Sequence, residues 1–262
     1  MHDPLQLLEL ARTVALEAGE LLAERQPHVR DFVGTKSSPT DMVTEVDTAS
    51  ERLIVDRILT ARPADGILAE EGSARDGSSG IRWLIDPVDG TTNFLYGFPA
   101  YAVSIAAEAA GETLAGVVYN PETRELFAAA KGHGATLNGS AIRVSAETEI
   151  ARALVGTGFG YDPGVRTRQA ETLVRLIGGI RDIRRAGSAA LDLCNVACGR
   201  VDAYYEQGLN PWDHAAGALI AREAGGLTEF LGAPAFPKPC IVAGTPGMFA
   251  AFRELLIAAA TT

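Results

Sequence analysis

Cysteine and histidine are scarce in this sequence. Its 262 residues include 3 Cys and 4 His. The cysteines form no Cys-x-x-Cys pair, and Cys194 and Cys198 lie one helical turn apart in an apolar segment, which indicates packing in a core. An odd number of cysteines and no secretory signal favour a cytoplasmic location. Histidines scattered along the chain argue against a His-rich zinc or iron centre.

Excess positive charge and long apolar runs are also missing. The formal net charge is −10, which argues against nucleic acid as the primary ligand. No apolar run approaches the length needed to span a membrane, so no membrane partner is expected. A chain of this length can bury a large core, either as one compact unit or as two small domains.

The most informative segment runs from Trp83 to Asn93 and reads Trp-Leu-Ile-Asp-Pro-Val-Asp-Gly-Thr-Thr-Asn. Its apolar start predicts the end of a buried strand. Asp86 and Asp89 then flank a Pro-Val pair in a turn that proline and Gly90 favour, so their carboxylates would converge on one point. A helix start after Gly90 would add backbone N–H groups that attract phosphate. The alternative is a plain Asp-Gly turn with solvated carboxylates.

Three further acidic segments favour an ion site over a plain turn. The segment 66–72 is a short apolar strand that ends in Glu70 and Glu71, two neighbouring carboxylates that repel each other unless a cation or a donor compensates. Asp213 and Asp47 each stand where a helix is expected to begin. Taken singly, these acids are explained by a solvated strand end or by ordinary helix capping.

Taken together, the four segments resemble the inositol monophosphatase family of magnesium-dependent, lithium-sensitive sugar phosphatases, in particular its bacterial branch. The resemblance covers nearly the whole chain, and its two longest motifs are highly specific. The matching segments, in chain order, are Lys36 to Asp47, Glu70-Glu71, Trp83 to Phe94, Arg185 to Ala190, Val201 to Glu206 and Trp212 to Gly217.

The resemblance implies a site for two to three Mg²⁺ ions. Glu70, Asp86 and the Val88 carbonyl would hold a first ion. Asp86, Asp89 and Asp213 would hold a second ion on the side of the leaving group. Oxygen ligands of this kind suit magnesium, and an acidic protein needs such cations to bind an anionic phosphate. Lithium would inhibit by occupying the second position.

The resemblance also implies direct attack by water, without a Ser, Cys or His nucleophile. Thr91, paired with Asp47, would orient the water and help to deprotonate it. Glu70 belongs to the catalytic set through the first ion. The amides of Gly90 and Thr91 would receive phosphate oxygens.

Contacts to the substrate are implied for residues at the pocket rim and at the acidic centre. They are Lys36, Asp89, Gly90, Thr91, Gly187, Ser188, Ala189, Glu206 and Asp213. The segment 187–190 is also an ordinary helix start of small residues, Glu206 could be a surface acid, and Lys36 could be a solvated lysine. Ser188 stands where relatives commonly have Thr, and Asn210 where several have His, so both departures leave the choice of substrate open.

The expected reaction is therefore Mg²⁺-dependent hydrolysis of myo-inositol monophosphate, a small phosphate monoester, by a homodimer. Apolar segments 100–109 and 154–159 predict part of the dimer surface, although they could equally be core. Phosphatases for fructose 1,6-bisphosphate, 3'-phosphoadenosine 5'-phosphate or histidinol phosphate share the same metal core and remain alternatives. A regulatory binding module that contacts the transcription or processing machinery and retains the metal site is another.

The expected fold class is α/β, with an α+β first half and an α/β second half, and the resemblance implies a layered α-β-α-β-α sandwich. We place the division at 1–146, which carries most metal ligands, and 147–262, which carries Asp213 and the ring contacts. The expected helices are 5–24, 49–61, 167–177, 188–198, 213–224 and 246–259. Strands are expected at 66–69, 83–85, 154–158, 180–184, 201–205, 227 and 241, with hairpins at Gly111, Asn120 and Asn138.

Overall fold

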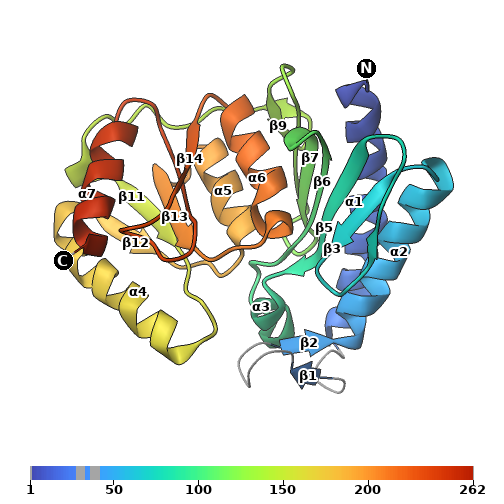
Figure 1. Cartoon of the computed structure of the whole chain (residues 1–262), viewed down its shortest axis with the longest axis horizontal. Coiled ribbons are helices and arrows are strands. Elements are labelled where there is room, and N and C mark those ends of the chain that lie inside the picture. The colour runs from blue at the N-terminus through green and yellow to red at the C-terminus, as the bar shows by residue number, and fades with distance from the viewer. Residues whose placement is uncertain (1, 28–32, 36–41, 262) are drawn as a thin grey trace.

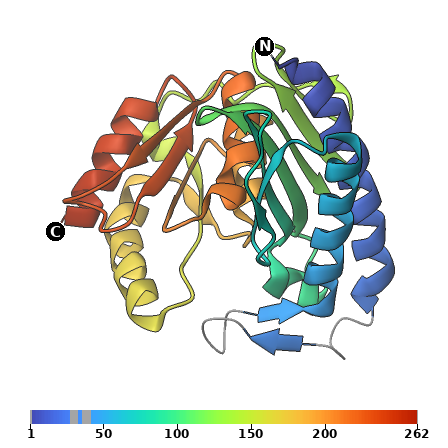
Figure 2. The same ribbon diagram turned by 45° about the vertical axis from the view of Figure 1, so that its right-hand side comes forward.

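The computed structural model describes residues 2–27, 33–35 and 42–261. The chain forms five layers in the order helix, sheet, helix, sheet, helix (Figure 1). The N-terminal helices form one outer layer and the C-terminal helix belongs to the other, so the two chain ends lie on opposite sides (Figure 1, Figure 2). The layered α/β sandwich predicted from the sequence is confirmed.

The first sheet has eight strands in the order β10-β9-β8-β7-β6-β5-β3-β4. All neighbours run antiparallel except β3 and β5, which are parallel. The strands are β3 (Gly66–Ala69), β4 (Ala74–Arg75), β5 (Ile81–Asp89), β6 (Ala102–Ala109), β7 (Glu112–Asn120), β8 (Glu125–Ala130), β9 (Ala135–Leu137) and β10 (Ser140–Ala141). The three predicted hairpins are confirmed.

One face of this sheet is covered by α1 (Pro4–Arg25) and α2 (Glu45–Ala61) (Figure 2). Asp3 begins α1, because its side chain accepts a hydrogen bond from the Leu5 amide at 2.9 Å. Apolar residues three or four positions apart on both helices form the stripe that packs on the sheet. Beyond the ends of these helices, β1 (Val33–Thr35) and β2 (Met42–Thr44) form a separate antiparallel pair.

The other face is covered by α5 (Ala189–Ala197) and α6 (Pro211–Glu223), which lie between the two sheets. Helix α6 approaches β7 closely, because a Cβ built on Gly116 would lie 2.9 Å from the Ala216 Cα. A helix layer buried on both sides requires apolar residues nearly all round, and α5 is buried at all of its nine positions but one.

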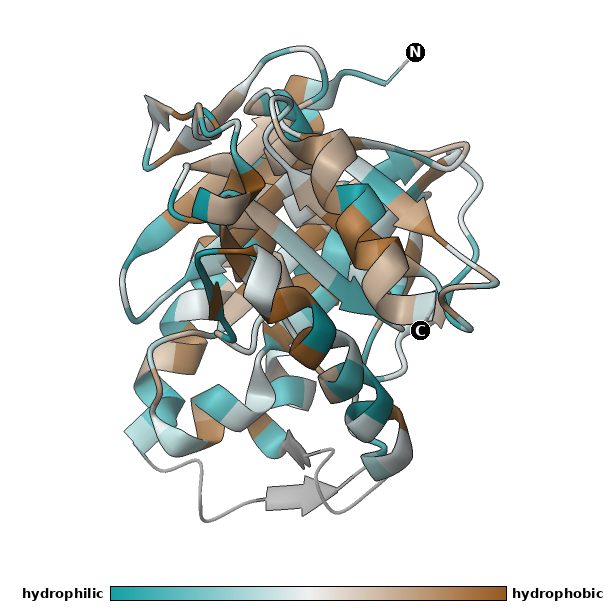
Figure 3. Ribbon diagram, turned by 90° about the vertical axis from the view of Figure 1, so that its left-hand side faces the viewer, coloured by the Kyte–Doolittle hydropathy of each residue, from teal (hydrophilic) through white to brown (hydrophobic). Residues whose placement is uncertain are grey.

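The second sheet has the order β12-β11-β13-β15-β14 and mixes parallel and antiparallel neighbours. Its outer face is covered by α4 and α7, whose ribbons carry both hydrophilic and hydrophobic residues (Figure 3). Its elements are β11 (Leu154–Thr157), α4 (Pro163–Leu176), β12 (Asp182–Arg184), β13 (Ala203–Gln207), β14 (Leu227–Leu231), β15 (Cys240–Gly244) and α7 (Phe249–Thr261). Across the described ranges, no helix combines the length and apolar character that a membrane span requires.

Besides shifts of a few residues at the ends of other elements, three sequence predictions differ from the structure where the site or the dimer is concerned. Strand β5 does not end at Ile85 but continues to Asp89, with one extra residue between Asp86 and Asp89 relative to β6, so these carboxylates lie on a bulged strand instead of a free turn. Helix α2 begins at Glu45, which places Asp47 in its first turn. The apolar segment 100–109 is core of this chain, because β6 is buried through most of its length.

That burial removes the surface argument for a dimer. The same holds for β11, where the residues after Leu154 are buried. The division at residue 146 stays a prediction. The first sheet lies on one side of it and the second sheet on the other, while α5 and α6 pack against both sheets.

Candidate active site

The predicted site residues line one end of a pocket of about 880 Å³, which also extends along α4 and the end of α7. Helix α3 (Thr91–Tyr96) begins at its edge, directly after β5. The pocket is lined by most of the predicted residues, namely Glu70, Asp86, Val88, Asp89, Gly90, Thr91, Gly187, Ala189, Glu206 and Asp213. Asp47 and Ser188 contact this set through hydrogen bonds. Lys36 lies outside the described residues.

Asp86 occupies the centre of the acidic end. It is 2% exposed, at the bulge of β5, and its Oδ1 accepts a hydrogen bond from the Val88 amide at 3.0 Å. Glu70 follows the neighbouring strand β3, and its amide donates to the Ile85 carbonyl at 3.1 Å. Parallel pairing of β3 and β5 therefore brings the two carboxyl groups to the same edge.

Asp89 is fixed by a helix start from the other half of the chain. Its Oδ2 accepts hydrogen bonds from the Ser188 hydroxyl at 2.6 Å and from the Ala190 amide at 2.7 Å. Gly187 precedes this helix with φ +94°, and its carbonyl would lie 3.0 Å from a Cβ on Gly90. The two loops thus touch, and a side chain at Gly90 would press on the Gly187 carbonyl.

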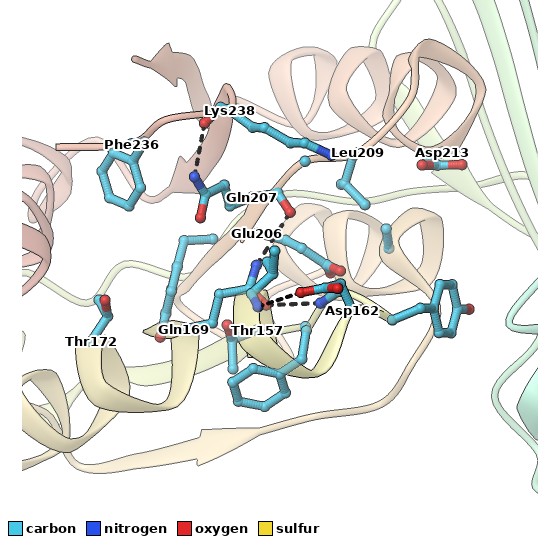
Figure 4. A pocket seen from close by; sticks show the side chains of 18 of the residues that line it. Thr157, Asp162, Gln169, Thr172, Glu206, Gln207, Leu209, Asp213, Phe236 and Lys238 are labelled. Carbon is cyan, nitrogen blue, oxygen red and sulfur yellow. Dashed lines mark hydrogen bonds between the residues drawn. The ribbon is translucent and has the colours of Figure 1, made fainter. Parts of the chain in front are cut away.

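Asp213 lies in the first turn of α6, where its Oδ2 accepts a hydrogen bond from the Asn210 amide at 2.7 Å. This is the reciprocal contact of a capping box, so the capping interpretation of Asp213 is correct. The carboxylate nevertheless lines the same pocket as Asp86 and Asp89, and Figure 4 shows it at one end of that pocket.

Thr91 and Asp47 form the pair that the sequence predicts. The Thr91 hydroxyl lies 3.1 Å from Asp47 Oδ1 and 3.1 Å from the Val88 carbonyl oxygen. Both side chains are buried, and Asp47 is fully inaccessible to solvent. A hydroxyl that donates to one of these acceptors keeps its lone pairs for a third group.

Burial and neighbouring charges raise the pKa of three of these acidic side chains. Burial, followed by the charges of Glu70, Asp89 and Asp213, raises the pKa of Asp86 well above its usual range. Burial, followed by the charge of Asp89, raises the pKa of Asp213 in the same way. Burial also raises the pKa of Asp89 to about 7, against the hydrogen bonds from Ser188 and Ala190 that lower it. A cation placed among these groups would remove their repulsion.

The donor chemistry at this end of the pocket fits magnesium. The ligands offered are carboxylates and a carbonyl, which magnesium prefers to nitrogen or sulfur. As the side chains stand, no three acids, histidines or cysteines in the described part of the chain form a ready set of metal ligands. One oxygen of each of the Asp89 and Asp213 carboxylates accepts a hydrogen bond from a backbone amide, which leaves the other oxygen of each for an ion.

Glu206 lies beside the acidic end and belongs to β13. The Tyr204 hydroxyl donates to its Oε2 at 2.6 Å. Burial raises the pKa of Glu206, while the Tyr204 hydrogen bond and the Arg185 charge lower it. A Cβ on Gly158 would lie 2.0 Å from the Glu206 carboxylate, so this glycine leaves the room that the acid occupies.

Two charged residues beside Glu206 were missed by sequence reasoning. Arg185 lines the pocket, and Asp192 is 1% exposed with one carboxylate oxygen that has no hydrogen-bond partner among the described residues. Burial, followed by Glu206 and Asp89, raises the pKa of Asp192 well above its usual range. In the sequence, Arg185 appears only as part of a matching motif. Asp192 looks like an ordinary first-turn acid of α5, so nothing in the sequence indicates that it lies beside the pocket.

The structure is thus a layered α/β sandwich with a buried carboxylate cluster in its pocket. The model of the "Inositol monophosphatase family" matches residues 3–251. The chain belongs to this family, as the resemblance of its sequence motifs indicates.

Similar proteins are named either as inositol-1-monophosphatases or as Nus factors. The chain is 47% identical over 242 residues to "Inositol-1-monophosphatase SuhB" of Mycobacterium tuberculosis, covering 86% of this chain and 83% of that protein. It is 42% identical over 247 residues to "Nus factor SuhB" of Vibrio cholerae, covering 92% and 91%. The crystal structure of the extragenic suppressor protein suhB from Bartonella henselae superposes with a TM-score of 0.89 at 38% identity, covering 96% of this chain and 98% of that one.

Proposed function

We propose that this chain hydrolyses myo-inositol monophosphate to myo-inositol and phosphate in the cytoplasm, with two to three Mg²⁺ ions per site. The observation that carries the proposal is the meeting of Glu70, Asp86, Asp89 and Asp213 in one pocket, next to the Thr91–Asp47 hydrogen bond. The relative from M. tuberculosis bears the name of this activity.

Glu70, Asp86, the Val88 carbonyl, Asp89 and Asp213 would hold the ions. Bound Mg²⁺ supplies an activated water and neutralises charge on phosphate and leaving oxygens. Helix α6 carries Asp213 from the opposite side of the pocket, so the ligand set closes only when the two halves are packed together.

Thr91 and Asp47 would act on the attacking water. With its proton donated to the Asp47 carboxylate, the Thr91 hydroxyl presents its lone pairs to the water and accepts a proton from it in a hydrogen bond. Because Asp47 is fully buried, its carboxylate keeps one orientation and fixes the hydroxyl. The amides of Gly90 and Thr91 would receive phosphate oxygens.

The inositol ring would lie against the Gly187–Ala189 loop and Glu206. The Glu206 carboxylate, oriented by Tyr204, would accept a hydrogen bond from a ring hydroxyl. The Ser188 hydroxyl is directed to Asp89 and positions that carboxylate, while the Ser188 backbone would meet the ring.

Phosphate release from a substrate panel tests the proposal. The panel contains inositol monophosphates, fructose 1,6-bisphosphate, 3'-phosphoadenosine 5'-phosphate and histidinol phosphate, each with and without Mg²⁺. We expect the highest kcat/KM for inositol monophosphate, dependence on Mg²⁺, and inhibition by lithium. A higher kcat/KM for another member of the panel would show that this other ester is the preferred substrate.

A second function is supported by the name Nus factor SuhB in relatives such as that of V. cholerae. In this function the chain would bind a protein of the transcription machinery. Complementation of a strain that lacks its Nus factor SuhB tests it, with the wild-type chain and Asp86→Asn in parallel. Rescue by both chains would show that the binding function does not require hydrolysis, whereas failure of both would reject the second function.

A symmetric homodimer completes the proposal, and the family resemblance alone supports it. Each site would use ligands from one chain. Light scattering at micromolar concentration should give twice the chain mass. Mixing two differently inactivated variants, Asp86→Asn and Asp213→Asn, should not restore activity; restored activity would mean that the site is shared between subunits.

A further inference from the structure

The buried face of α2 carries polar residues in its first two turns. Ser50 and Glu51 follow Asp47 by three and four positions, so the three side chains share one face of the helix. They are 0%, 3% and 0% exposed, respectively. Ile54 and Ile58 continue the same face as the apolar stripe that a core-facing helix requires. Buried polar side chains are nearly always hydrogen-bonded, so each of the three indicates a partner that needs it.

Two of these side chains bond to the end of β5 and the residues just after it. The Thr91 hydroxyl lies 3.1 Å from Asp47 Oδ1, as described above. The Ser50 hydroxyl donates to the Pro87 carbonyl at 3.3 Å, inside the bulge of β5. One face of α2 thus holds the strand that carries two of the proposed ion ligands, and Glu51 extends this face to the loop of a third.

Glu51 bonds to the turn that follows Glu70. Its Oε2 accepts a hydrogen bond from the Glu71 amide at 2.6 Å, and its Oε1 accepts one from the Ser73 amide at 2.9 Å. Both carboxylate oxygens therefore bind backbone amides of one turn, 20 and 22 positions away in the chain. Hydrogen bonds from amides to an ionised carboxylate are roughly twice as strong as those between neutral groups, so this contact holds the turn firmly.

The turn after β3 is fixed on two sides of Glu70. The Glu70 amide donates to the Ile85 carbonyl at 3.1 Å, which continues the pairing of β3 with β5. The Ala69 amide donates to the Ser73 carbonyl at 2.9 Å and closes the turn. Glu51 holds the amides on the far side of the turn. The Glu70 side chain leaves the backbone between these anchors and lines the pocket, so the anchors determine where its carboxylate lies.

A third acid beside Glu70 and Glu71 is costly unless its position requires a carboxylate. A buried charge without partners is strongly unfavourable, and the two amide hydrogen bonds offset that cost for Glu51. An ionised carboxylate offers two acceptor oxygens in one plane, whereas a glutamine amide offers only one and places a donor at the second position. The two amides of this turn therefore match Glu at position 51 and do not match its neutral isostere.

We propose that Glu51 is a positioning residue for the ion that Glu70 would hold: it fixes the turn after β3 and thereby sets where the Glu70 carboxylate meets Asp86. The inference rests on the ion site of the proposed phosphatase function. Glu51 acts through Glu70, because Glu51 does not line the pocket and its two oxygens are bound to amides. Loss of a group that orients a metal ligand typically weakens metal binding by about 10- to 100-fold.

Calorimetric titration with Mg²⁺ alone tests this role without any turnover. Glu51→Gln keeps the size of the side chain and directs an NH₂ group at an amide donor, so we expect the Kd for Mg²⁺ to rise at least about tenfold. The Mg²⁺ concentration for half-maximal hydrolysis should rise by the same factor, while KM for inositol monophosphate at saturating Mg²⁺ stays that of the wild type. Glu51→Asp keeps both acceptor oxygens and should give an intermediate Kd; it replaces Glu51→Gln in the titrations if that variant does not fold.

Glu223→Gln is the matched control. The Glu223 carboxylate, on α6, also accepts hydrogen bonds from two amides of one turn, those of Gly132 and Gly134, both at 2.8 Å. It does not line the pocket, so this control should leave the Kd for Mg²⁺ unchanged although it loses the same kind of contact. A fall in Tm of Glu51→Gln with an unchanged Kd for Mg²⁺ would assign Glu51 to the fold alone and overturn the proposal.

A double-variant comparison shows whether the effect passes through Glu70. Glu70→Gln alone should weaken Mg²⁺ binding, and adding Glu51→Gln should then change the Kd little, because the ligand that Glu51 positions is already altered. Full additivity of the two changes would overturn the proposal. If no ester of the substrate panel is hydrolysed, the proposed function fails, while the Mg²⁺ titrations of the same variants still decide the role of Glu51. Absence of Mg²⁺ binding by the wild type would overturn both.

Discussion

Burial and neighbouring charge act on the pKa of Asp86 in the same direction in the free protein. It is buried, and three other carboxylates raise its pKa. Asp86→Asn should abolish turnover, because the proposed ion positions lose a shared charge. The amide removes repulsion and should not lower Tm.

The measurement is kcat with inositol monophosphate alongside Tm. Asp76→Asn, an exposed acid that does not line the pocket, is the control. Retention of more than about a tenth of wild-type kcat, a barrier change below about 1.4 kcal/mol, would contradict a bridging role for Asp86.

Glu206 is assigned to a substrate hydroxyl and to no ion. Glu206→Gln should therefore reduce kcat/KM for inositol monophosphate more than for a simple aryl phosphate, which has no ring hydroxyls. A hydrogen bond to a charged group contributes about 1.5–3 kcal/mol, so a difference of at least about tenfold is expected. Equal losses on both substrates would place Glu206 in the chemistry or in the fold.

Residue types and spacing predicted the acids of β5, because both stand in one short segment. The same reasoning could not predict what holds them. Ser188 and Asp89 are hydrogen-bonded although 99 positions separate them in the chain. Such contacts depend on how the two sheets pack, and no local pattern encodes that.

At the scale of the elements, α6 and β7 approach each other closely enough for a substitution to test the contact. Gly116→Ala would place a Cβ 2.9 Å from the Ala216 Cα and 3.1 Å from its carbonyl oxygen. Overpacking of this kind costs about 1–3 kcal/mol, so Tm should fall. Gly178→Ala is the control, because a Cβ there meets no atom within 4 Å. Equal Tm for both variants would show that the middle layer can shift away from the first sheet.

Helices were predicted well because apolar residues recur with the helical period, as in α1. Strand ends were less predictable. The proline and glycine after Ile85 predicted a turn, yet pairing with β6 extends β5 through a bulge to Asp89. Apolar runs such as 100–109 also leave open whether they face a partner or a core, since burial depends on the helices that cover the sheet.

At the scale of the whole molecule, the acid cluster makes stability depend on pH. The folded-state pKa of Asp89, about 7, exceeds the unfolded value of about 4, so the folded chain binds the proton more tightly. Its contribution to stability is fully present below the unfolded pKa and is lost as pH rises through about 7. Asp86 and Asp213 shift in the same direction.

The metal-free protein in EDTA should therefore lose Tm between about pH 5 and pH 8, and Mg²⁺ should restore more of it at the higher pH. Thermal unfolding with and without Mg²⁺ measures this. Asp86→Asn should flatten the metal-free profile. A metal-free Tm that stays level or rises over this range would contradict the raised pKa values.

The middle helix layer has a consequence for how the chain unfolds. Helices α5 and α6 complete the cores of both sheets, so neither sheet can open while the other keeps its packing. Backbone amides at the centre of β6 and of β13 should then exchange with deuterium through the same global opening, with equal protection and equal sensitivity to denaturant. One cooperative transition would assemble both sides of the pocket at once, so partly folded chains would not carry half a site.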